Sequence, residues 1–320
     1  MFKKMVKQCL NKEFGHRCDD SGLLFYYNTC DFPGLKDEDF SFTSTNLNIL
    51  RGKIFTTNLT SIKDPIIFCH GMGGGYLSYM KEIAYLAFKL NRPIIAFDYT
   101  ATFSSDGKSL IGFNEPTIDL FNCIEHLKND KRFTHSKFSL IGHSWGGYTV
   151  GNYLNFNNDI DKAVLISAPI SYKNVVLDRL PVVLGFLWPT IKKSEIDLFG
   201  DYARYDLLKS ISNTKSNVLV LHSTDDKVVS YKKNFVELKE KINSYNVTFK
   251  TVYNKGHNPT YKADASKYLQ TVFKNAKKIK NSELKNYFLQ VDWQKATSLD
   301  DEVMNYICEF LKWGVVLWLF

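Results

Sequence analysis

Cysteine and arginine are both scarce in this sequence. Its 320 residues include six cysteines, no two of which form a Cys-x-x-Cys pair. Such sparse cysteine excludes a disulfide scaffold and gives no signal for a zinc or thioredoxin-like site. Only six of the 41 basic residues are Arg, and the lysines are scattered along the chain. Because nucleic-acid-binding surfaces cluster Arg and Lys on one face, the net charge of +8 does not favour a nucleic-acid partner.

Long apolar runs are also lacking. No run reaches the roughly 20 residues of a membrane span, and none of about 7–15 apolar residues follows the N-terminal lysines as in a signal peptide. We therefore expect a cytoplasmic protein. The apolar residues 313–320 end the chain. Three roles stay open for this tail: docking on the core, dimerisation, or weak contact with a membrane surface. The oligomeric state is equally open.

The sequence is rich in short apolar segments that alternate with helical patterns. Apolar strands separated by helices predict a parallel sheet covered on both faces, and therefore a doubly wound α/β fold. Strands are expected at 48–55, 65–69, 93–97, 137–141, 163–167, 218–222 and 247–252. Helices are expected at about 76–90, 116–129, 145–155, 230–242 and 298–313.

Two stretches interrupt this alternation. Residues 170–216 hold prolines and large apolar side chains between two strands, which predicts an inserted helical cap. Residues 263–297 are lysine-rich, helical by composition, and precede the last helix, for which Ser298 or Asp300 is the expected N-cap. We expect a single domain, residues 1–320, that carries both insertions.

The most specific motif is Gly142-His143-Ser144-Trp145-Gly146, which follows an expected strand and opens an expected helix. That context is what a nucleophile elbow requires. The turn is so tight that side chains two residues before and after the serine would clash, which explains Gly142 and Gly146. Ser144 would then stand at the carboxyl end of the sheet, where open α/β sheets bind ligands. The alternative is a glycine-tolerant turn with a capping serine.

On these residues the chain resembles the α/β-hydrolase superfamily, over roughly residues 48–262 and the last helix. The resemblance implies a mostly parallel sheet of the α/β-hydrolase type with a small inserted cap. It also implies that Ser144 is a nucleophile and that a histidine follows a late strand. His257 meets that condition, in a glycine-flanked loop after strand 247–252. Histidines at other strand ends, such as His222, are more often structural.

The resemblance places an acid in the loop after strand 218–222. The family pattern Gly-x-x-Asp-x-x-Val fits with Ser223 at the glycine position and Asp226 as the acid. A buried carboxylate there would fix the tautomer of the imidazole and stabilise the imidazolium. Asp225 is the alternative acid, and a solvated turn would explain it. The resulting order of serine, aspartate and histidine is the one expected for this fold.

The segment His70-Gly71-Met72-Gly73-Gly74-Gly75 resembles the family's oxyanion loop. The resemblance implies that the backbone N–H groups of Met72 and Trp145 stabilise charge on a tetrahedral intermediate. The alternatives are a flexible glycine loop and a phosphate-binding turn. Residues 97–107 resemble the family's Asp-x-x-Gly-x-Gly-x-Ser loop, with Thr100 and Thr102 in place of the glycines and a structural role.

The resemblance as a whole implies a serine hydrolase of the carboxylesterase or lipase kind. It would cleave an ester of a small-molecule acyl substrate through an acyl-enzyme, without cofactor or metal. Thioesterase, peptidase, C–C hydrolase and cofactor-free haloperoxidase share the same triad and stay open. A scaffold of the same fold is the non-enzymatic alternative. Fold and triad do not fix the substrate.

Overall fold

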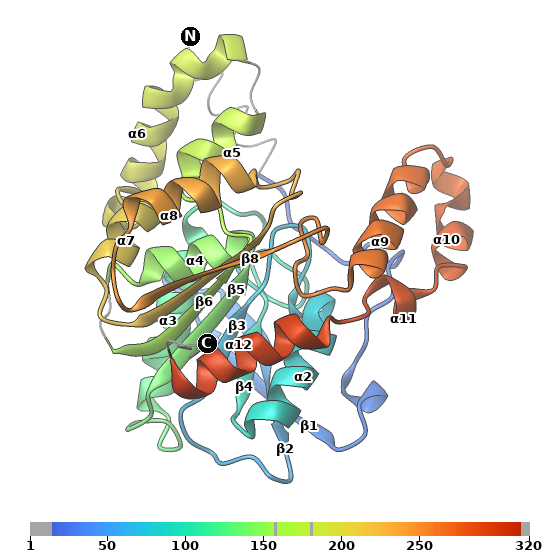
Figure 1. Cartoon of the computed structure of the whole chain (residues 1–320), viewed down its shortest axis with the longest axis horizontal. Coiled ribbons are helices and arrows are strands. Elements are labelled where there is room, and N and C mark those ends of the chain that lie inside the picture. Colours follow the sequence, from blue (N-terminus) through green and yellow to red (C-terminus); the bar gives the residue numbers. More distant parts are fainter. Residues whose placement is uncertain (1–14, 157–158, 180–181, 315–320) are drawn as a thin grey trace, which may run out of the picture.

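One sheet organises the protein (Figure 1). The computed structural model describes residues 15–156, 159–179 and 182–314, and within them eight strands pair in the order β1-β2-β4-β3-β5-β6-β7-β8. The pairs β1–β2 and β2–β4 are antiparallel, and the pairs from β4–β3 to β7–β8 are parallel. The predicted doubly wound, mostly parallel sheet is therefore confirmed. The strands are β1 (Leu35–Thr43), β2 (Ile49–Thr57), β3 (Ile66–Cys69), β4 (Ile94–Phe97), β5 (Phe138–His143), β6 (Ile160–Ile166), β7 (Asn217–Ser223) and β8 (Val247–Val252).

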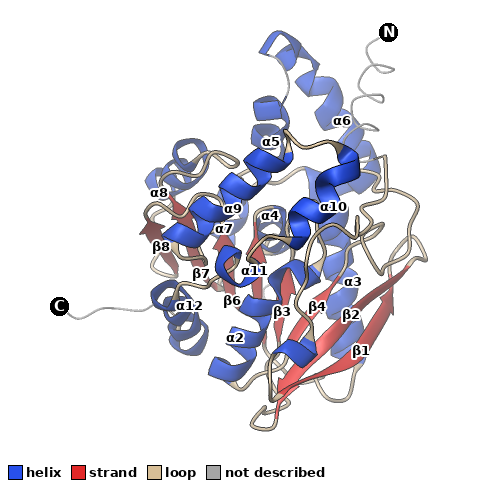
Figure 2. Ribbon diagram, turned by 90° about the vertical axis from the view of Figure 1, so that its right-hand side faces the viewer, coloured by secondary structure: helices blue, strands red, loops and turns tan. Residues whose placement is uncertain are grey.

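Helices cover both faces of this sheet (Figures 1 and 2). Their apolar sides pack on strand residues that alternate between the faces: Ile66 and Phe68 of β3 contact one cluster, and Ile67 and Cys69 contact the other. The first cluster includes residues of α2 and α12, and the second includes residues of α3, α4, α7 and α8. The helices of the sheet framework are α2 (Met80–Leu90), α3 (Glu115–Asn129), α4 (Trp145–Tyr153), α8 (Glu237–Lys241) and α12 (Asp301–Trp313).

The structure adds one strand that was not expected, β1, and otherwise differs from the sequence-based expectation mostly at element ends. The first expected helix opens with a 3₁₀ turn, Tyr76–Tyr79, before α2. The helix expected at 230–242 begins as a π-helical turn, Lys232–Val236, and continues as α8. Of the two candidate caps of the last helix, Asp300 is the N-cap of α12, where its side chain accepts from the N–H of Val303 at 3.0 Å.

Two groups of helices lie outside the alternation of strands and helices. Between β6 and β7 the chain forms α5 (Tyr172–Arg179), α6 (Trp188–Phe199) and α7 (Leu207–Asn213), together with two 3₁₀ turns, Val182–Leu187 and Gly200–Ala203. Between β8 and α12 it forms α9 (Ala263–Ala276), α10 (Asn281–Leu289) and α11 (Trp293–Ala296). In Figure 1, α9 and α10 stand side by side at one side of the sheet, while α5 and α6 lie above it.

The amino-terminal ends of the central strands are joined to the last helix through Arg92. Its Nε donates to the carbonyl of Asp64 at 2.5 Å, and its guanidinium also reaches Ser139 Oγ at 3.0 Å and the carbonyl of Leu311 at 3.2 Å. These partners precede β3, lie in β5 and lie in α12, so one side chain connects three elements that are far apart in the sequence.

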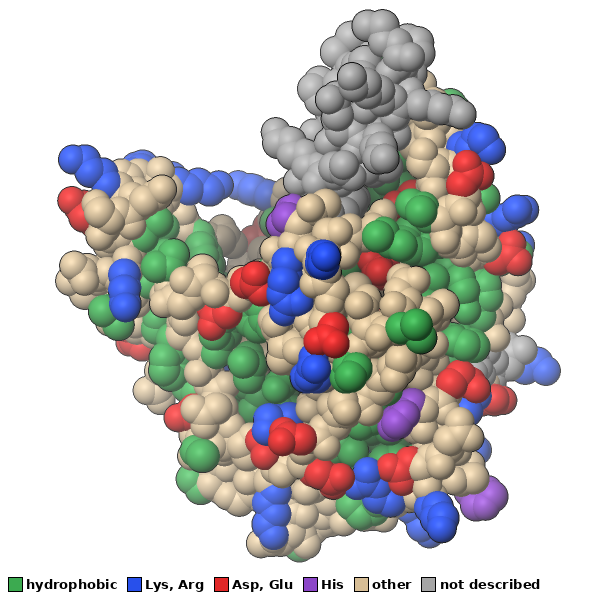
Figure 3. Space-filling view, turned by 180° about the vertical axis from the view of Figure 1, so that it is seen from behind, with side chains coloured by type: hydrophobic (Ala, Val, Ile, Leu, Met, Phe, Trp, Pro, Cys, Tyr) green, Lys and Arg blue, Asp and Glu red, His purple; other side chains and the backbone are tan. Residues whose placement is uncertain are grey.

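On the face drawn in Figure 3, basic and acidic side chains of the described residues are interspersed. The described residues of this face therefore form no patch of one charge. No helix in the described part of the chain is both long and apolar enough to cross a bilayer. Most of the C-terminal tail, residues 315–320, lies outside the described residues.

Candidate active site

Ser144 occupies a strained turn between β5 and α4. Its φ of 56° and ψ of −116° are unfavourable for a residue with a Cβ, and such strain is typical of functional sites. The two flanking glycines are required by close backbone approach. A Cβ on Gly142 would overlap the carbonyl of Gly146, and one on Gly146 would overlap the carbonyl of Cys69. The local backbone therefore has the steric features expected of an elbow.

Ser144, His257 and Asp226 form a continuous chain of hydrogen bonds. The Oγ of Ser144 lies 2.9 Å from Nε2 of His257, and Nδ1 of His257 lies 2.8 Å from Oδ2 of Asp226. The three residues come from the β5–α4 turn, the loop after β8 and the loop after β7. These loops meet at one edge because β5, β7 and β8 lie in the parallel part of one sheet, within four consecutive strands.

The carboxylate of Asp226 is fully buried and strongly hydrogen-bonded. Its Oδ1 accepts from the backbone N–H groups of Val228 and Val229 at 2.8 and 3.0 Å. Burial alone would raise the pKa of Asp226, but the hydrogen bonds from His222 and His257 and from the N–H of Val229 hold that pKa well below its usual range. Asp226 is therefore ionised at neutral pH, as a partner of an imidazolium must be.

His222 is a second imidazole on the same carboxylate, which sequence reasoning missed. Its Nε2 lies 3.1 Å from Oδ2 of Asp226 and 2.9 Å from the carbonyl of Val229. Because that carbonyl can only accept, Nε2 of His222 carries the proton. The available signal was its position at the end of β7, four residues before the acid. We find that this histidine, expected to be merely structural, contacts Asp226 directly.

The alternative acid, Asp225, lies exposed in a turn, as expected, but its carboxylate is also hydrogen-bonded. Its Oδ1 accepts from the N–H groups of Lys255 and Gly256 at 3.1 and 2.9 Å, and from Ser223 Oγ at 2.6 Å. The solvated-turn interpretation therefore holds for the exposure of Asp225 but does not account for these three hydrogen bonds. These bonds fix the backbone immediately before His257, and none of them reaches its imidazole.

His143, inside the elbow, points away from the nucleophile as expected and connects two loops. Its Nε2–H donates to the carbonyl of His257 at 2.7 Å, and its Nδ1 accepts from the hydroxyl of Tyr79 at 2.8 Å. The same Tyr79 oxygen accepts from the N–H of Gly71 at 3.0 Å. Burial, aided by the nearby His257, lowers the pKa of His143 to about 3, so this imidazole is neutral.

The glycine loop after β3 is held by His70. Its Nδ1–H donates to the carbonyl of Gly71 at 2.8 Å, and its Nε2 accepts from the N–H of Tyr99 at 3.2 Å. Burial lowers the pKa of His70 to about 4, which keeps both roles available in the neutral ring. His70 thus has a structural role, and it shapes the segment that carries Met72.

In the loop after β4, the two positions that correspond to the family's glycines lie one residue later than expected. Thr100 and Thr102 were the expected replacements for the family glycines. The positive φ values fall instead on Ala101 (55°) and Phe103 (39°). The two residues that need glycine-like conformations are therefore the neighbours of those expected, and they carry the strain that glycine would avoid.

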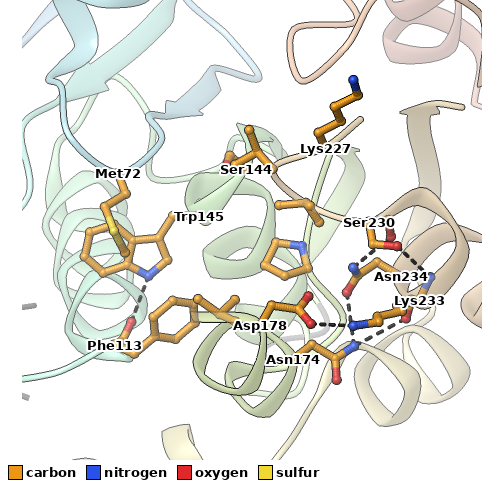
Figure 4. Close-up of a pocket in the computed structure, with 14 residues that line it drawn as sticks. Met72, Phe113, Ser144, Trp145, Asn174, Asp178, Lys227, Ser230, Lys233 and Asn234 are labelled. Atoms are coloured by element: carbon orange, nitrogen blue, oxygen red, sulfur yellow. Dashed lines mark hydrogen bonds and ion pairs between the residues drawn. The ribbon is translucent and has the colours of Figure 1, made fainter. Parts of the chain in front are cut away.

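A cavity of about 360 Å³ opens beside Ser144 (Figure 4). Met72 and Trp145 line it together with Ser144, and the indole N–H of Trp145 donates to the carbonyl of Phe113 at 2.9 Å. The opposite wall is more polar and comes from α5 and the π-helical turn, where Asp178 pairs with Lys233 at 2.5 Å. Among the described residues, no group of three or more His, Cys, Asp or Glu side chains could hold a metal ion.

Solved structures resemble this fold over most of its length. An esterase of Pyrococcus furiosus matches with a TM-score of 0.59 and 20% identity, over 82% of this chain and 98% of its own. Acetyl xylan esterase 1 of Thermoanaerobacterium sp. matches with a TM-score of 0.53 and 15% identity, over 81% and 87%. The alpha/beta hydrolase GrgF of Penicillium sp. matches with a TM-score of 0.55 and 14% identity, over 82% and 99%.

The sequence comparisons cover less of the chain than the structural ones. A search of curated proteins finds no significant match. Residues 64–193 match the family model described as alpha/beta hydrolase fold, and this range includes β3, the glycine loop, the elbow and α5. The family match and the arrangement of the eight strands agree. The chain therefore has the α/β-hydrolase fold, and its residues 64–193 match the family of that name.

Proposed function

We propose that the protein is a serine hydrolase that cleaves a carboxylic ester through an acyl-enzyme. The observation that carries this proposal is the chain of hydrogen bonds from Ser144 Oγ through His257 to Asp226, at the edge of a cavity. A serine hydroxyl is a weak nucleophile until an adjacent base removes its proton. The three groups are within the distances that such a transfer requires.

The proposed reaction begins with attack of Ser144 Oγ on the ester carbonyl carbon. His257 Nε2 takes the hydroxyl proton, and the buried charge of Asp226 stabilises the resulting imidazolium. The carbonyl oxygen becomes negative and is stabilised by the N–H groups of Met72 and Trp145. The imidazolium then protonates the leaving alcohol. A water molecule, deprotonated by the same imidazole, attacks the acyl carbon. The bond to Ser144 Oγ breaks, the imidazolium returns its proton to that oxygen, and the acyl group leaves as a carboxylic acid.

The named structural neighbours support an ester over the other bonds that this chemistry could attack, and the cavity is suited to its acyl group. Two of the similar structures are named esterases, although they share only 20% and 15% of their residues with this chain. The cavity wall nearest Ser144 is apolar, with Met72, Phe113 and Trp145, which suits a small acyl group. Residues 170–216 supply the opposite wall through Asn174, Val175 and Asp178, so we propose that this insertion acts as a cap.

The test is covalent labelling followed by turnover. A fluorophosphonate probe should label the wild-type protein at Ser144, with one adduct per chain by mass spectrometry, and should not label Ser144→Ala. Wild-type protein should hydrolyse p-nitrophenyl esters, and Ser144→Ala should lose about 10³-fold or more in kcat. Absence of an adduct would favour a non-enzymatic scaffold. An adduct together with faster cleavage of a thioester or peptide would keep the nucleophile and replace the ester.

A further inference from the structure

A second cavity, of about 210 Å³, lies under α6 and is separate from the cavity beside Ser144. Its walls come from α4, from the start of α5, from α6 and from the segment that leads into α7. No residue lines both cavities. The proposed catalytic mechanism gives this second cavity no role.

An unsatisfied polar group lies in its wall. The side chain of Tyr172 is among those that line the cavity, and the residue is only 6% exposed. Its hydroxyl has no hydrogen-bond partner in the described part of the chain. Buried hydroxyl groups are normally hydrogen-bonded, because an unpaired one forfeits its bonds to water. A ligand atom that accepts a hydrogen bond would satisfy this hydroxyl.

Two of the basic side chains around the cavity have no ionic partner among the described residues. Three basic side chains, those of Lys173, Lys192 and Arg204, line it together with two acidic ones. Arg204 pairs with Asp201 at 3.1 Å. Neither lysine forms an ion pair with any residue that the structure describes.

Both acidic groups are already engaged by hydrogen bonds from the protein. The two oxygens of Glu195 accept from the N–H of Phe113 and from Asn114 Nδ2, each at 2.9 Å. Oδ1 of Asp206 accepts from the N–H of Lys209 at 3.1 Å, at the N-terminus of α7. The two lysines are therefore the cationic groups left to meet an incoming anion.

The rest of the wall is aromatic. The rings of Tyr148, Tyr172, Trp188 and Tyr205 line the cavity. Tyr172 and Trp188 lie with ring centroids 5.6 Å apart, so the apolar surface is continuous between α5 and α6. Such rings favour a flat apolar body, since aromatic pairs gain energy beyond the surface that they bury.

We propose that this cavity is a second binding site, specific for a small aryl carboxylate. Its carboxylate would lie between Lys173 and Lys192 and accept a hydrogen bond from Tyr172, with its ring among the aromatic side chains. The site is adjacent to the catalytic cavity without being part of it. The ring of Tyr172 stacks on Phe113 with centroids 4.9 Å apart, and Phe113 lines the cavity beside Ser144.

Benzoate is the probe, and the isosteric neutral benzamide is its matched control. Isothermal titration calorimetry should detect benzoate binding to the whole chain at millimolar concentrations, and benzamide binding should be at least about tenfold weaker. Lys173→Gln combined with Lys192→Gln should weaken benzoate binding about tenfold or more, because it removes both unpaired cations. Tyr172→Phe should weaken it severalfold while retaining the ring.

Two other lysines serve as controls. Lys193 neighbours Lys192 in α6 but pairs with Asp197, and Lys227 lines the catalytic cavity instead. Lys193→Gln and Lys227→Gln should leave benzoate binding unchanged. Melting temperatures should show that all variants fold, since the four lysines are exposed.

Three results would each overturn the proposal: no benzoate binding by the wild-type chain, binding that survives in the double variant, or binding that is lost in Lys227→Gln instead. Because the readout is binding rather than turnover, the result does not depend on whether the protein is an esterase.

Discussion

The imidazole of His143 donates a 2.7 Å hydrogen bond to the backbone carbonyl of His257, so the residue before the nucleophile holds the loop of the proposed base. The chain of contacts continues through the hydroxyl of Tyr79 to the N–H of Gly71. A neutral ring between two loops can keep their spacing constant without competing for the proton that Ser144 would release. The elbow, the glycine loop and the histidine loop are thereby fixed relative to one another.

Removal of the Tyr79 hydroxyl tests this connection. Tyr79→Phe leaves the Gly71 N–H and His143 Nδ1 without their shared partner, and we expect a loss of about 1–3 kcal/mol in the free energy of unfolding. If the connection also sets the geometry of the site, kcat on a p-nitrophenyl ester should fall while KM changes little. Urea unfolding and steady-state kinetics measure both effects. Tyr85→Phe is the control: it removes a hydroxyl of α2 that donates to Asn305 in α12, away from Ser144, and it should leave kcat unchanged. A stable, fully active Tyr79→Phe protein would remove the positioning role.

The two adjacent aspartates should behave differently. Asp226→Asn keeps the shape but cannot stabilise an imidazolium, and a comparable change in a serine protease costs about 10⁴ in kcat. Asp225→Asn retains an oxygen that can accept from Lys255 and Gly256, so its kcat should stay within about tenfold of wild type. Kinetics of both variants on one ester decide the matter. The reverse order of severity would mean that the acid has been assigned one residue too late.

Met72 should matter through its backbone rather than its side chain. Met72→Ala retains the N–H and should change kcat modestly, with an altered preference for acyl length because the side chain lines the cavity. Met72→Pro removes the N–H and should lose about 10²–10³ in kcat, the scale of one oxyanion donor. KM should shift less, because the oxyanion forms only towards the transition state. Circular dichroism must show that the proline variant is folded; a folded variant with unchanged kcat would leave the second donor unassigned.

Glu82 should make stability depend on pH. Its buried side chain accepts from Thr260 Oγ1 at 3.0 Å, and burial raises its pKa from 4.5 to about 7. The folded state therefore holds this proton more tightly than the unfolded state. Its contribution is fully present below pH 4.5 and is lost as the pH rises to about 7. When the pH is raised from 5 to 8, the free energy of unfolding should thus fall less in Glu82→Gln than in the wild type. The two decreases should differ by up to about 3 kcal/mol.

Urea unfolding at the two pH values measures this difference. Other buried acids titrate in both proteins, so their effects cancel in the comparison. The exposed change Glu302→Gln should reproduce the wild-type pH dependence. If the free energy of unfolding fell by the same amount in Glu82→Gln as in the wild type, Glu82 would not be the group responsible.

Much of the sheet could be predicted because its strands are buried on both faces. A strand such as β3 is apolar at every position, and that pattern predicts a covered parallel sheet without knowledge of its partners. The edge strand β1 was harder, because most of its side chains are exposed and polar, and its antiparallel pairing with β2 leaves little local signal.

In the candidate site, too, some residues could be predicted from the local sequence and others could not. Ser144 and His257 stood out because the elbow and the late glycine-flanked loop require particular residue types nearby in the sequence. The role of His222 could not be predicted, because its contact with Asp226 depends on how the loop after β7 folds back. The contacts of Asp225 with residues 255 and 256 depend on the pairing of β7 with β8, which also brings distant segments together.

The contacts of Arg92 lie at the end of the sheet opposite to the proposed catalytic residues. The chemistry is proposed for loops at the carboxyl ends of the strands, whereas this guanidinium connects the loop before β3, β5 and α12 at the opposite end. Variation near Ser144 can therefore alter substrate preference while the far end keeps the fold assembled. Substitution of Arg92 would therefore lower the fraction of folded protein. The molecules that did fold would have an unchanged kcat.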